Sequence, residues 1–529
     1  MITPDLPSDP ETLQRLLLAE RVSHAVEIAR LAEERDRALS VSERLRAIIH
    51  ELQRHRFGRR SERLDGDQLA LALEELEQAA ASAEADEERS ATPARARPAR
   101  RRINRGALPT DLPRVEQVID VADQTCPCCA GLMHRIGEDV AERLDVIPAQ
   151  FRVLVVRRPK YACRACEGTV VQAPAPSRLI EGGLPTEALV AHVVVAKYAD
   201  HCPLYRQAQI YARQGIALDR STLADWVGRA AWYLRPLHER LLDALRGSAK
   251  LFADETTAPV LDPGRGRTKT GQLWAYARDD RPWGGPAPPA VAYLYAPDRK
   301  AERLIAHLQG FRGILQVDGY AGYRALADRG QIQLAFCWAH VRRHFYEIAQ
   351  GNKARPGAAP IATAALARIA ELYAIEADIR GRSPAERQAV RHERARPVIE
   401  ALKPWLEAQL AAVSQKAPIA QAIRYALSRW TGLTRLLDDG RIEIDSNTVE
   451  RSIRPIALNR KNALFAGSDG GGEHWAIHAS LIETCKLNDI DPQAYLADVL
   501  ARLAAGHPIN RIDELLPWAW VAARQTQRA

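Results

Sequence analysis

The 529-residue sequence predicts a multidomain protein of the α+β class. Three observations predict this class. A helical segment with a heptad pattern begins the chain, two cysteine pairs beside a β-rich stretch follow, and two apolar runs that end in aspartate precede a long helical region. Since one domain commonly holds about 100 to 200 residues, the length favours several domains over one small module.

The first segment, residues 1–79, is predicted to be a coiled coil that joins protomers. Between Leu13 and Leu52, nine of twelve positions of one heptad series are apolar. A single amphipathic helix packed on its own protein is the alternative. Residues 80–114 are rich in Ala, Glu, Pro and Arg, and we expect a basic flexible linker that either contacts phosphates or is simply solvated.

Residues 115–182 are predicted to form a small zinc-binding β module. Two C-x-x-C pairs flank the alternating apolar residues 151–163, and two such pairs can supply the four thiolates of a structural zinc site. The 33 residues between the pairs exceed the usual spacing of about 15 to 20. Buried reduced cysteines and a redox dithiol are the alternatives. The expected ligands are Cys126, Cys129, Cys163 and Cys166, with Cys128 as a spare thiol.

Residues 183–246 show a helix-turn-helix pattern. Gly215 lies where a short turn would separate a helix that ends near Arg213 from one capped by Asp219 or Ser221. In DNA-binding proteins the second helix of this motif enters the major groove, although many helical hairpins have the same pattern. The residues expected to contact DNA are Arg220, Ser221 and Thr222.

Residues 247–349 contain two apolar runs that each end in an aspartate, Asp254 and Asp318. On adjacent strands of one sheet the two carboxylates would lie side by side, which is costly unless cations neutralise them. Sites rich in carboxylate oxygens favour Mg²⁺ or Mn²⁺. For either aspartate alone, the start of a turn is the simpler interpretation.

A third acid, Glu450, lies in residues 441–479. Asp445, Ser446 or Asn447 can cap a helix that carries Glu450 in its first turns and that Pro455 would interrupt. An acid among basic residues is typical of a metal ligand beside phosphate-binding cations, while a salt-bridged surface helix is the alternative. The basic residues are Arg451, Arg454, Arg460 and Lys461.

The remaining segments are predicted to be helical. Residues 350–440 are rich in Ala and Arg and are interpreted as a helical insertion, and residues 480–529 form a C-terminal helical segment. We expect Gly470 to Gly472 to form a flexible loop, and no phosphate-binding loop because no G-K-[ST] follows. Cys337 and His340 form a C-x-x-H unit that could bind a second structural metal, but core packing is the simpler interpretation.

The charge of the chain is unevenly distributed. The whole chain carries 74 Lys and Arg against 66 Asp and Glu, a net charge of +8. Residues 1–90 contain 13 basic and 20 acidic residues, so the rest contains 61 basic and 46 acidic residues, a net charge of +15. A positive body favours a polyanionic partner such as nucleic acid, although a solvated basic surface gives the same balance.

Long blocks of the sequence resemble the large transposase of insertion-sequence family sixty-six, and they occur in the family's order along nearly the whole chain. They are FGRRSERL (57–64), the paired C-x-x-C, PLYRQAQIYARQGIALDRSTLADWVG (203–228), ADETTAPVL (253–261), TGQLWAY (270–276), VDGYAGY (317–323), CWAHVRRHF (337–345), ERSIRPIALNRKNALFAGSDGG (450–471) and SLIETCKLNDIDPQAYLADVL (480–500). One departure is Asp445-Ser446-Asn447, where the family tends to have Asp-Asn-Asn.

The resemblance implies an RNase H-like α/β catalytic core of the Asp-Asp-Glu type, interrupted by the helical insertion. The triad would be Asp254, Asp318 and Glu450, and the choice of Glu450 over Glu443 or Asp445 rests mainly on the family. Two Mg²⁺ or Mn²⁺ ions would support cleavage of 3′ ends and strand transfer.

The implied partners are double-stranded DNA, as terminal inverted repeats and as target, a second copy of the chain, and small accessory proteins of the same element. A DNA-binding regulator without catalysis and a nuclease that cuts without joining are the alternative functions. No apolar run approaches the length of a membrane span and residues 1–20 lack the pattern of a signal peptide, so we expect a cytoplasmic location.

Overall fold

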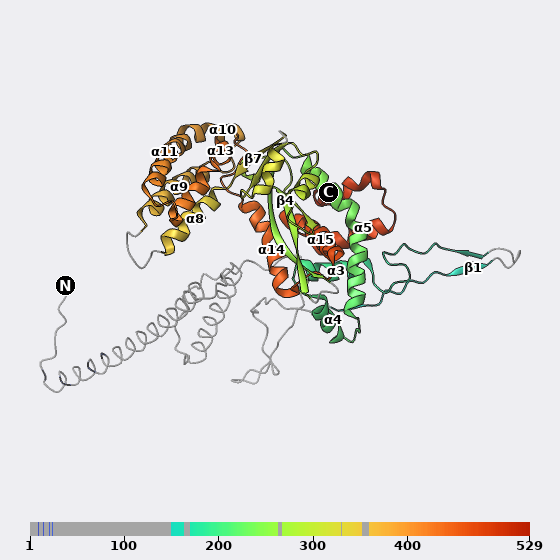
Figure 1. Cartoon of the computed structure of the whole chain (residues 1–529). Helices are drawn as coiled ribbons and strands as arrows, with labels where there is room; N and C mark the ends of the chain where they lie inside the picture. Colours follow the sequence, from blue (N-terminus) through green and yellow to red (C-terminus); the bar gives the residue numbers. More distant parts are fainter. Residues whose placement is uncertain are drawn as a thin grey trace. The chain divides into compact units, whose positions relative to one another are not determined.

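The computed structural model describes residues 150–162, 170–262, 267–328, 331–351 and 359–528, together with four single residues near the start of the chain (Figure 1). The chain divides into two compact units, Met1–Ile147 and Pro148–Ala529. All the elements below belong to the second unit. The coiled coil, the basic linker and the four zinc ligands expected from the sequence lie outside the described residues.

A five-stranded mixed sheet organises the second unit, with the strand order β5-β4-β3-β6-β7. β3 pairs antiparallel with β4, which pairs antiparallel with β5, whereas β3, β6 and β7 run parallel. The carboxyl ends of β6 and β7 therefore meet at one edge. The bounds are β3 Lys250–Asp262, β4 Arg267–Arg278, β5 Ala290–Ala296, β6 Gly313–Val317 and β7 Ile332–Phe336.

The edge strand β5 is covered by α15 (Asp469–Leu487). The Tyr293 backbone N–H donates to the Ser480 hydroxyl at 2.8 Å, and the Thr484 hydroxyl both accepts from Val291 N (3.1 Å) and donates to Val291 O (2.9 Å). These bonds satisfy backbone groups that an uncovered edge strand would expose to other chains.

The helices around the sheet share its apolar core. They are α3 Glu187–Tyr198, α4 Leu204–Ala212, α5 Arg220–Arg246, α6 Ala301–His307, α7 Arg324–Ala327, α14 Asn447–Ala463, α16 Pro492–Ala504 and α17 Pro517–Arg528. Short 3₁₀ turns occupy Arg281–Trp283, Ala321–Tyr323 and Ile509–Leu515. No helix in the described ranges is long and apolar enough to cross a membrane.

Between β7 and α14 the chain forms a group of helices with a second apolar core, coloured yellow to orange in Figure 1. Buried ion pairs of Arg387 and Arg391 with Glu376 cross-link it. The elements are α8 Trp338–Gly351, α9 Pro360–Asp378, α10 Pro384–Val390, a π-helical turn Arg391–Ala395, α11 Arg396–Ala412, α12 Pro418–Leu427, α13 Trp430–Thr434 and a 3₁₀ turn Arg435–Leu437.

Several local predictions are wrong. β3 does not end at Asp254 but continues to Asp262, because β4 pairs with it from Phe252 to Asp262. α14 runs through Pro455, so this proline does not interrupt the helix. Gly470 to Gly472 belong to the first turn of α15, where the Ser468 side chain accepts from the Gly471 N–H.

In the stretch expected to be β-rich, the described residues 151–162 contain one strand of three residues. β1 (Lys160–Ala162) pairs antiparallel with β2 (Val170–Gln172). Val153 to Val156 precede β1 as irregular backbone with exposed side chains. The alternating apolar pattern there does not correspond to one face of a buried strand.

Candidate active site

The first two expected acids lie on neighbouring parallel strands. Phe252 of β3 pairs with Gln316 of β6, and the same register continued by two residues places Asp254 beside Asp318. Asp254 lies within the long strand β3, whereas Asp318 follows the last residue of β6. The parallel pairing thus brings together two carboxylates that are 64 positions apart in the sequence.

Glu450 lies in the first turn of α14, which packs against β3. Burial, together with the charges of Glu255, Asp318 and Glu450, raises the pKa of Asp254 to about 7, against the Glu255 N–H that donates to Asp254. The structure therefore brings all three expected acids into electrostatic contact. A partly buried group of carboxylates that repel one another fits a divalent cation, which neutralises them.

Glu255, the residue after Asp254, has a different environment. Its side chain is only 3% exposed and is paired with Arg299, whose Nε lies 2.8 Å from Glu255 Oε1. The Tyr323 hydroxyl donates to Glu255 Oε2 at 3.0 Å. The charge of the Glu255 carboxylate is therefore neutralised within the protein. The preceding residue, Asp254, instead lies near other acidic side chains.

Two residues of the insertion hold the loop that carries Asp318. The Tyr425 hydroxyl donates to the Asp318 backbone oxygen at 2.9 Å, and Arg429 Nη2 donates to the Gly319 oxygen at 3.1 Å. Gly319 has φ +101°, and a Cβ there would lie 2.4 Å from Arg429 Nε. The Asp318 side chain accepts from the Tyr320 N–H. Sequence reasoning missed Tyr425 and Arg429, because no local motif marks them.

The two other acids near Glu450 have partners of their own. The Glu443 carboxylate is paired with the buried Arg387 at 2.8 Å. The Asp445 carboxylate accepts from the Asn447 N–H (3.1 Å) and amide side chain (2.7 Å), and burial raises its pKa. Glu450 is 40% exposed at its side chain.

The basic residues expected to contact DNA lie along α14. Arg451, Arg454 and Lys461 are exposed. Arg460 is half-buried and donates to the Thr257 hydroxyl of β3 at 2.7 Å. Three of the four side chains therefore lie at the surface of the helix that carries Glu450, while Arg460 also ties that helix to β3.

The helical hairpin of α4 and α5 has the predicted turn. Gly215 has φ +79°, and α5 begins at Arg220 with Asp219 as its N-cap residue. Arg220 and Ser221 are exposed and Thr222 is half-buried. The expected apolar face is buried, and it extends along a helix of 27 residues that packs against α15. The hairpin is therefore part of the same unit as the acids.

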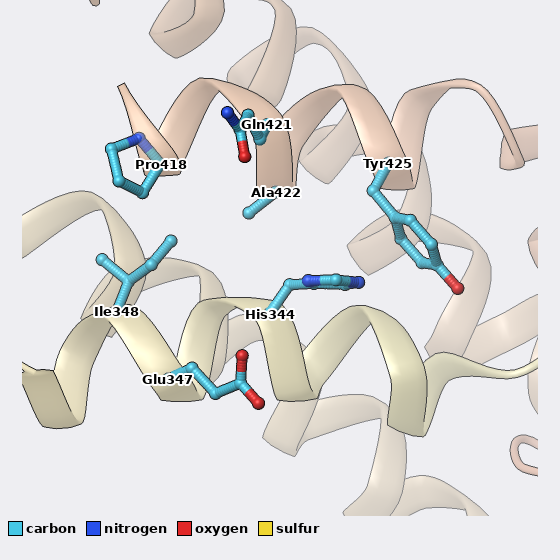
Figure 2. A pocket seen from close by; sticks show the side chains of 7 residues that line it. All are labelled: His344, Glu347, Ile348, Pro418, Gln421, Ala422 and Tyr425. Carbon is cyan, nitrogen blue, oxygen red and sulfur yellow. The ribbon is translucent and has the colours of Figure 1, made fainter. Parts of the chain in front are cut away.

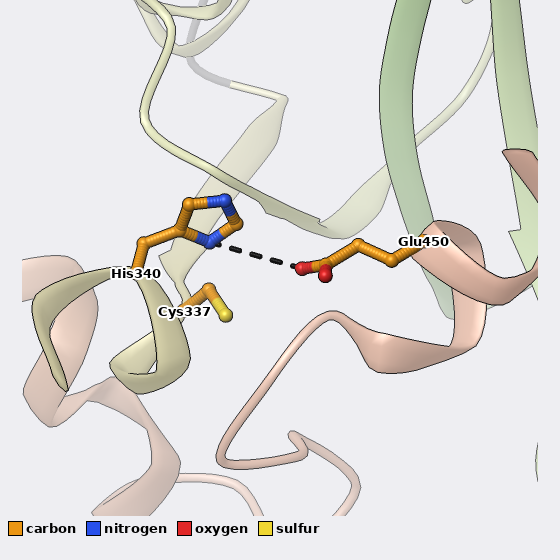
Figure 3. Close-up of side chains that lie close together, drawn as sticks. All are labelled: Cys337, His340 and Glu450. Carbon is orange, nitrogen blue, oxygen red and sulfur yellow. Dashed lines mark ion pairs between the residues drawn. The ribbon is translucent and has the colours of Figure 1, made fainter. Parts of the chain in front are cut away.

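Cys337 and His340 lie next to Glu450 (Figure 3). Cys337 follows β7 and is 1% exposed, as expected for core packing, and burial raises the pKa of its thiol to about 11. The Ser446 N–H donates to Cys337 Sγ at 3.2 Å, and the Ser446 hydroxyl donates to Glu450 Oε1 at 2.9 Å. His340 Nδ1 lies 3.8 Å from the same oxygen.

A cavity of about 590 Å³ lies between α8 and α12 (Figure 2). His344, Glu347 and Ile348 line it from α8, and its α12 side includes Tyr425, the residue that holds the Asp318 loop. The His344 ring stacks obliquely on that tyrosine, with ring centroids 4.3 Å apart. None of the three acids lines this cavity.

Family models match most of the chain. The model described as Transposase IS66 family matches residues 182–474, and the IS66 C-terminal element matches residues 480–518. The zinc-finger binding domain of transposase IS66 matches residues 123–167, which contain the four expected zinc ligands. The model described as Transposase C of IS166 homeodomain matches residues 44–116, where a coiled coil and a linker were expected.

Full-length relatives occur in Sinorhizobium fredii. The chain is 48% identical to the uncharacterized protein y4jD over 496 residues, which cover 92% of this chain and 96% of the relative. It is 44% identical to the uncharacterized protein y4qI over 536 residues, with 97% of each chain covered. The uncharacterized protein y4hP is 41% identical over 495 residues, 90% of this chain and 88% of the relative.

Proposed function

The chain belongs to the IS66 family of transposases, and on that basis we propose that it cleaves the 3′ ends of an insertion sequence and joins them to target DNA. The observation that carries this proposal is the grouping of Asp254, Asp318 and Glu450, in which burial first, and then the charges of Glu255, Asp318 and Glu450, raise the pKa of Asp254. Groups of acids that cannot all ionise without a cation are typical of metal-dependent phosphoryl transfer.

The proposed core is RNase H-like. The sheet supports this fold because three antiparallel strands precede two parallel strands, and the first acid lies on the strand at the centre of the sheet. The helix with the third acid packs against the same strand after the insertion. The match to a family, rather than the sheet alone, supports the assignment to transposases.

Glu450 is the best third acid among the three candidates. Arg387 neutralises Glu443, and Asn447 binds both oxygens of Asp445. Glu450 has an exposed side chain and acts directly on the pKa of Asp254. It can therefore complete a ligand group that is open to a DNA phosphate.

Two divalent ions, Mg²⁺ or Mn²⁺, would supply charge neutralisation and activation of the attacking oxygen when bound by these acids. The protein residues fix the positions of the carboxylates. β3 and β6 hold Asp254 and Asp318 in parallel register, and Ser446 orients Glu450 through its hydroxyl. Cleavage by water and joining by a 3′-hydroxyl then differ only in the attacking oxygen, so one site serves both.

The DNA contacts are assigned to two surfaces. The exposed basic side chains of α14 lie beside Glu450 and would hold the phosphates next to the cut. Arg220 and Ser221 at the exposed start of α5, together with Thr222, would contact the terminal repeat. We also propose that the four cysteines of the zinc-binding module bind a structural zinc ion. The chain would associate with a second copy of itself and act with accessory proteins of the same element.

The test is a cleavage and joining assay on labelled DNA that carries the element's terminal repeats, with Mg²⁺ or Mn²⁺. Asp254→Asn, Asp318→Asn and Glu450→Gln should each lower cleavage at least a hundredfold while the variants still bind the DNA. Asp513→Asn removes an acid from an exposed ion pair with Arg240 and is the matched control.

Each alternative function predicts a different result. Cleavage by Asp254→Asn at the wild-type rate would disprove the assignment of the acids. Binding without cleavage by the wild-type protein would indicate a regulator, and free 3′ ends without joined product would indicate a nuclease.

A further inference from the structure

We propose that Cys337, His340 and Glu450 form a binding site for a thiophilic divalent ion, with Zn²⁺ as the best fit, and that the bound ion withdraws Glu450 from catalysis. The inhibitory part rests on the proposed function. The binding part does not, because it depends only on the three side chains.

The three side chains are close enough to share one ion. One ligand atom from each residue, a sulfur, a ring nitrogen and a carboxylate oxygen, lies within 4.8 Å of the other two. In tetrahedral zinc sites with Zn–N and Zn–O distances of about 2.0 to 2.1 Å, the nitrogen and oxygen are about 3.4 Å apart. His340 Nδ1 and Glu450 Oε1 are 3.8 Å apart, so a small rotation of either side chain is enough.

The chemistry of the donors selects the metal. Thiolate, imidazole and carboxylate are the three ligand types of zinc, whereas Mg²⁺ prefers oxygen alone. This group therefore differs from the neighbouring all-carboxylate group, although both include Glu450. Three protein ligands also leave a fourth position for water or a phosphate oxygen.

The local backbone is suited to a thiolate ligand. Cys337 stands between β7 and α8, and the C-x-x-H spacing places His340 in the first turn of α8 on the same side (Figure 3). Burial raises the pKa of the Cys337 thiol, and the N–H groups of Ser446 and His340, which both donate to the sulfur, act against this increase. Hydrogen bonds to a charged acceptor stabilise its charged form.

The histidine has an unused ligand atom. His340 Nδ1 is buried and has no hydrogen-bond partner among the described residues. Buried polar atoms are normally satisfied, and an unsatisfied one often marks an absent ion or water. The nitrogen faces the Glu450 carboxylate, and a metal ion between them would satisfy it.

Occupancy has a consequence for catalysis because Glu450 would be shared. A carboxylate whose Oε1 coordinates zinc beside Cys337 donates less charge to ions held by Asp254 and Asp318. We therefore expect Zn²⁺ to inhibit cleavage in the presence of Mg²⁺, and the thiol to be required for that inhibition.

Binding is tested with Co²⁺, whose bond to a thiolate gives an ultraviolet charge-transfer band. Full-length protein is first loaded with one equivalent of Zn²⁺ for the N-terminal cysteines and then titrated with Co²⁺. The wild-type protein should gain a cobalt–thiolate band that Cys337→Ser lacks. Cys202→Ser changes a half-buried free cysteine on another part of the unit and should retain the band.

A second variant, His340→Ala, controls for the possibility that Cys337→Ser loses the cobalt band through misfolding. His340→Ala keeps the thiol and should weaken Co²⁺ binding at least tenfold, with a melting temperature close to that of the wild-type protein. Equal cobalt bands in wild-type, Cys337→Ser and His340→Ala proteins would disprove the site. In that case Cys337 and His340 only support α8 beside Glu450.

Inhibition is measured as the ratio of cleavage rates with and without Zn²⁺ at constant Mg²⁺. The wild-type rate should fall at least tenfold, and the ratio should approach one in Cys337→Ser. Equal inhibition of both proteins would show that zinc acts elsewhere. If the wild-type protein does not cleave at all, the proposed function fails while the cobalt titration still decides the site.

Discussion

The Tyr425 hydroxyl donates a hydrogen bond of 2.9 Å to the backbone carbonyl oxygen of Asp318. Tyr425 belongs to α12 of the insertion, and Arg429, the N-cap residue of α13, donates to the next carbonyl, that of Gly319. The insertion therefore contacts the loop of the second acid directly. Its helices support the position of Asp318 in addition to forming a core of their own.

Tyr425→Phe should lower the rate of cleavage about fivefold to tenfold with little effect on DNA affinity. The variant loses one hydrogen bond, worth about 1 kcal/mol, at the loop that positions Asp318. Tyr346→Phe on α8 makes the same chemical change and keeps the ring contact with Arg342, so it serves as the control. Equal rates for Tyr425→Phe and wild-type protein would show that the hydrogen bond does not position the acid.

Gly319→Ala should destabilise the protein and reduce cleavage more than tenfold. The added Cβ would lie 2.4 Å from Arg429 Nε, and the φ of +101° is unfavourable for alanine, at a cost of about 1 to 3 kcal/mol. Gly310→Ala has a similar φ of +85° with nothing within 4 Å of the Cβ. Both variants should melt earlier, but only Gly319→Ala should lose cleavage.

Asp254→Asn should stabilise the metal-free protein at pH 8. Since the folded pKa of Asp254 is about 7 and the ordinary value is 3.8, the folded state holds its proton more tightly than the unfolded state. Stability therefore falls as pH rises from about 4 to 7, and the full penalty, on the order of 4 kcal/mol, is present above pH 7.

Thermal unfolding in a chelator measures this effect. The wild-type and Asp254→Asn curves should coincide near pH 4 and separate by pH 8, and Mg²⁺ should raise the wild-type melting temperature more than that of the variant. A lower melting temperature for Asp254→Asn at pH 8 would contradict the repulsion among the acids.

Acid should destabilise the body of the protein between pH 6.5 and about 3. Burial lowers the pKa of His478 to about 3 and that of His238 to about 4 from an ordinary value of 6.5. The unfolded chain therefore takes up protons first as pH falls, so stability is complete above 6.5 and declines below it, by on the order of 3 to 5 kcal/mol per histidine.

His238→Gln tests this dependence because glutamine can still donate to the Tyr293 carbonyl that His238 contacts. Plots of melting temperature against pH should be flatter for His238→Gln than for the wild-type protein. His507→Gln, at a less buried position of the C-terminal segment, is the control. Parallel plots for all three proteins would rule out His238 as a cause of acid unfolding.

The sequence predicted the proximity of Asp254 and Asp318 better than it predicted the bounds of the strands and helices that contain the acids. Apolar runs placed Asp254 and Asp318 on strands, and the parallel register agrees. The predicted end of β3 was wrong because hydrogen bonds to β4, which the apolar run does not reveal, extend the strand through its second half. Pro455 is tolerated within α14, where the carbonyl that loses its partner belongs to Arg451, an exposed residue.

Contacts between residues far apart in the chain could not be predicted from the sequence. Tyr425 and Asp318 are 107 positions apart, and only the packing of α12 reveals that they touch. The contact between Cys337 and Ser446 is also visible only in the fold. Cys337 was expected in the core, and it lies beside Glu450, the candidate third acid. The predicted zinc ligands and coiled coil remain predictions, because these residues are outside the described ranges.

The insertion also determines when the candidate site can form during synthesis. Asp318 and Glu450 are 132 positions apart, and a ribosome releases the chain from its N-terminus. A nascent chain therefore carries two of the three acids, and an uncovered β5 edge, until α14 and α15 have emerged. A gene copy with a stop codon anywhere in the insertion would encode a protein without Glu450, and under the proposed function such a chain would not cleave DNA.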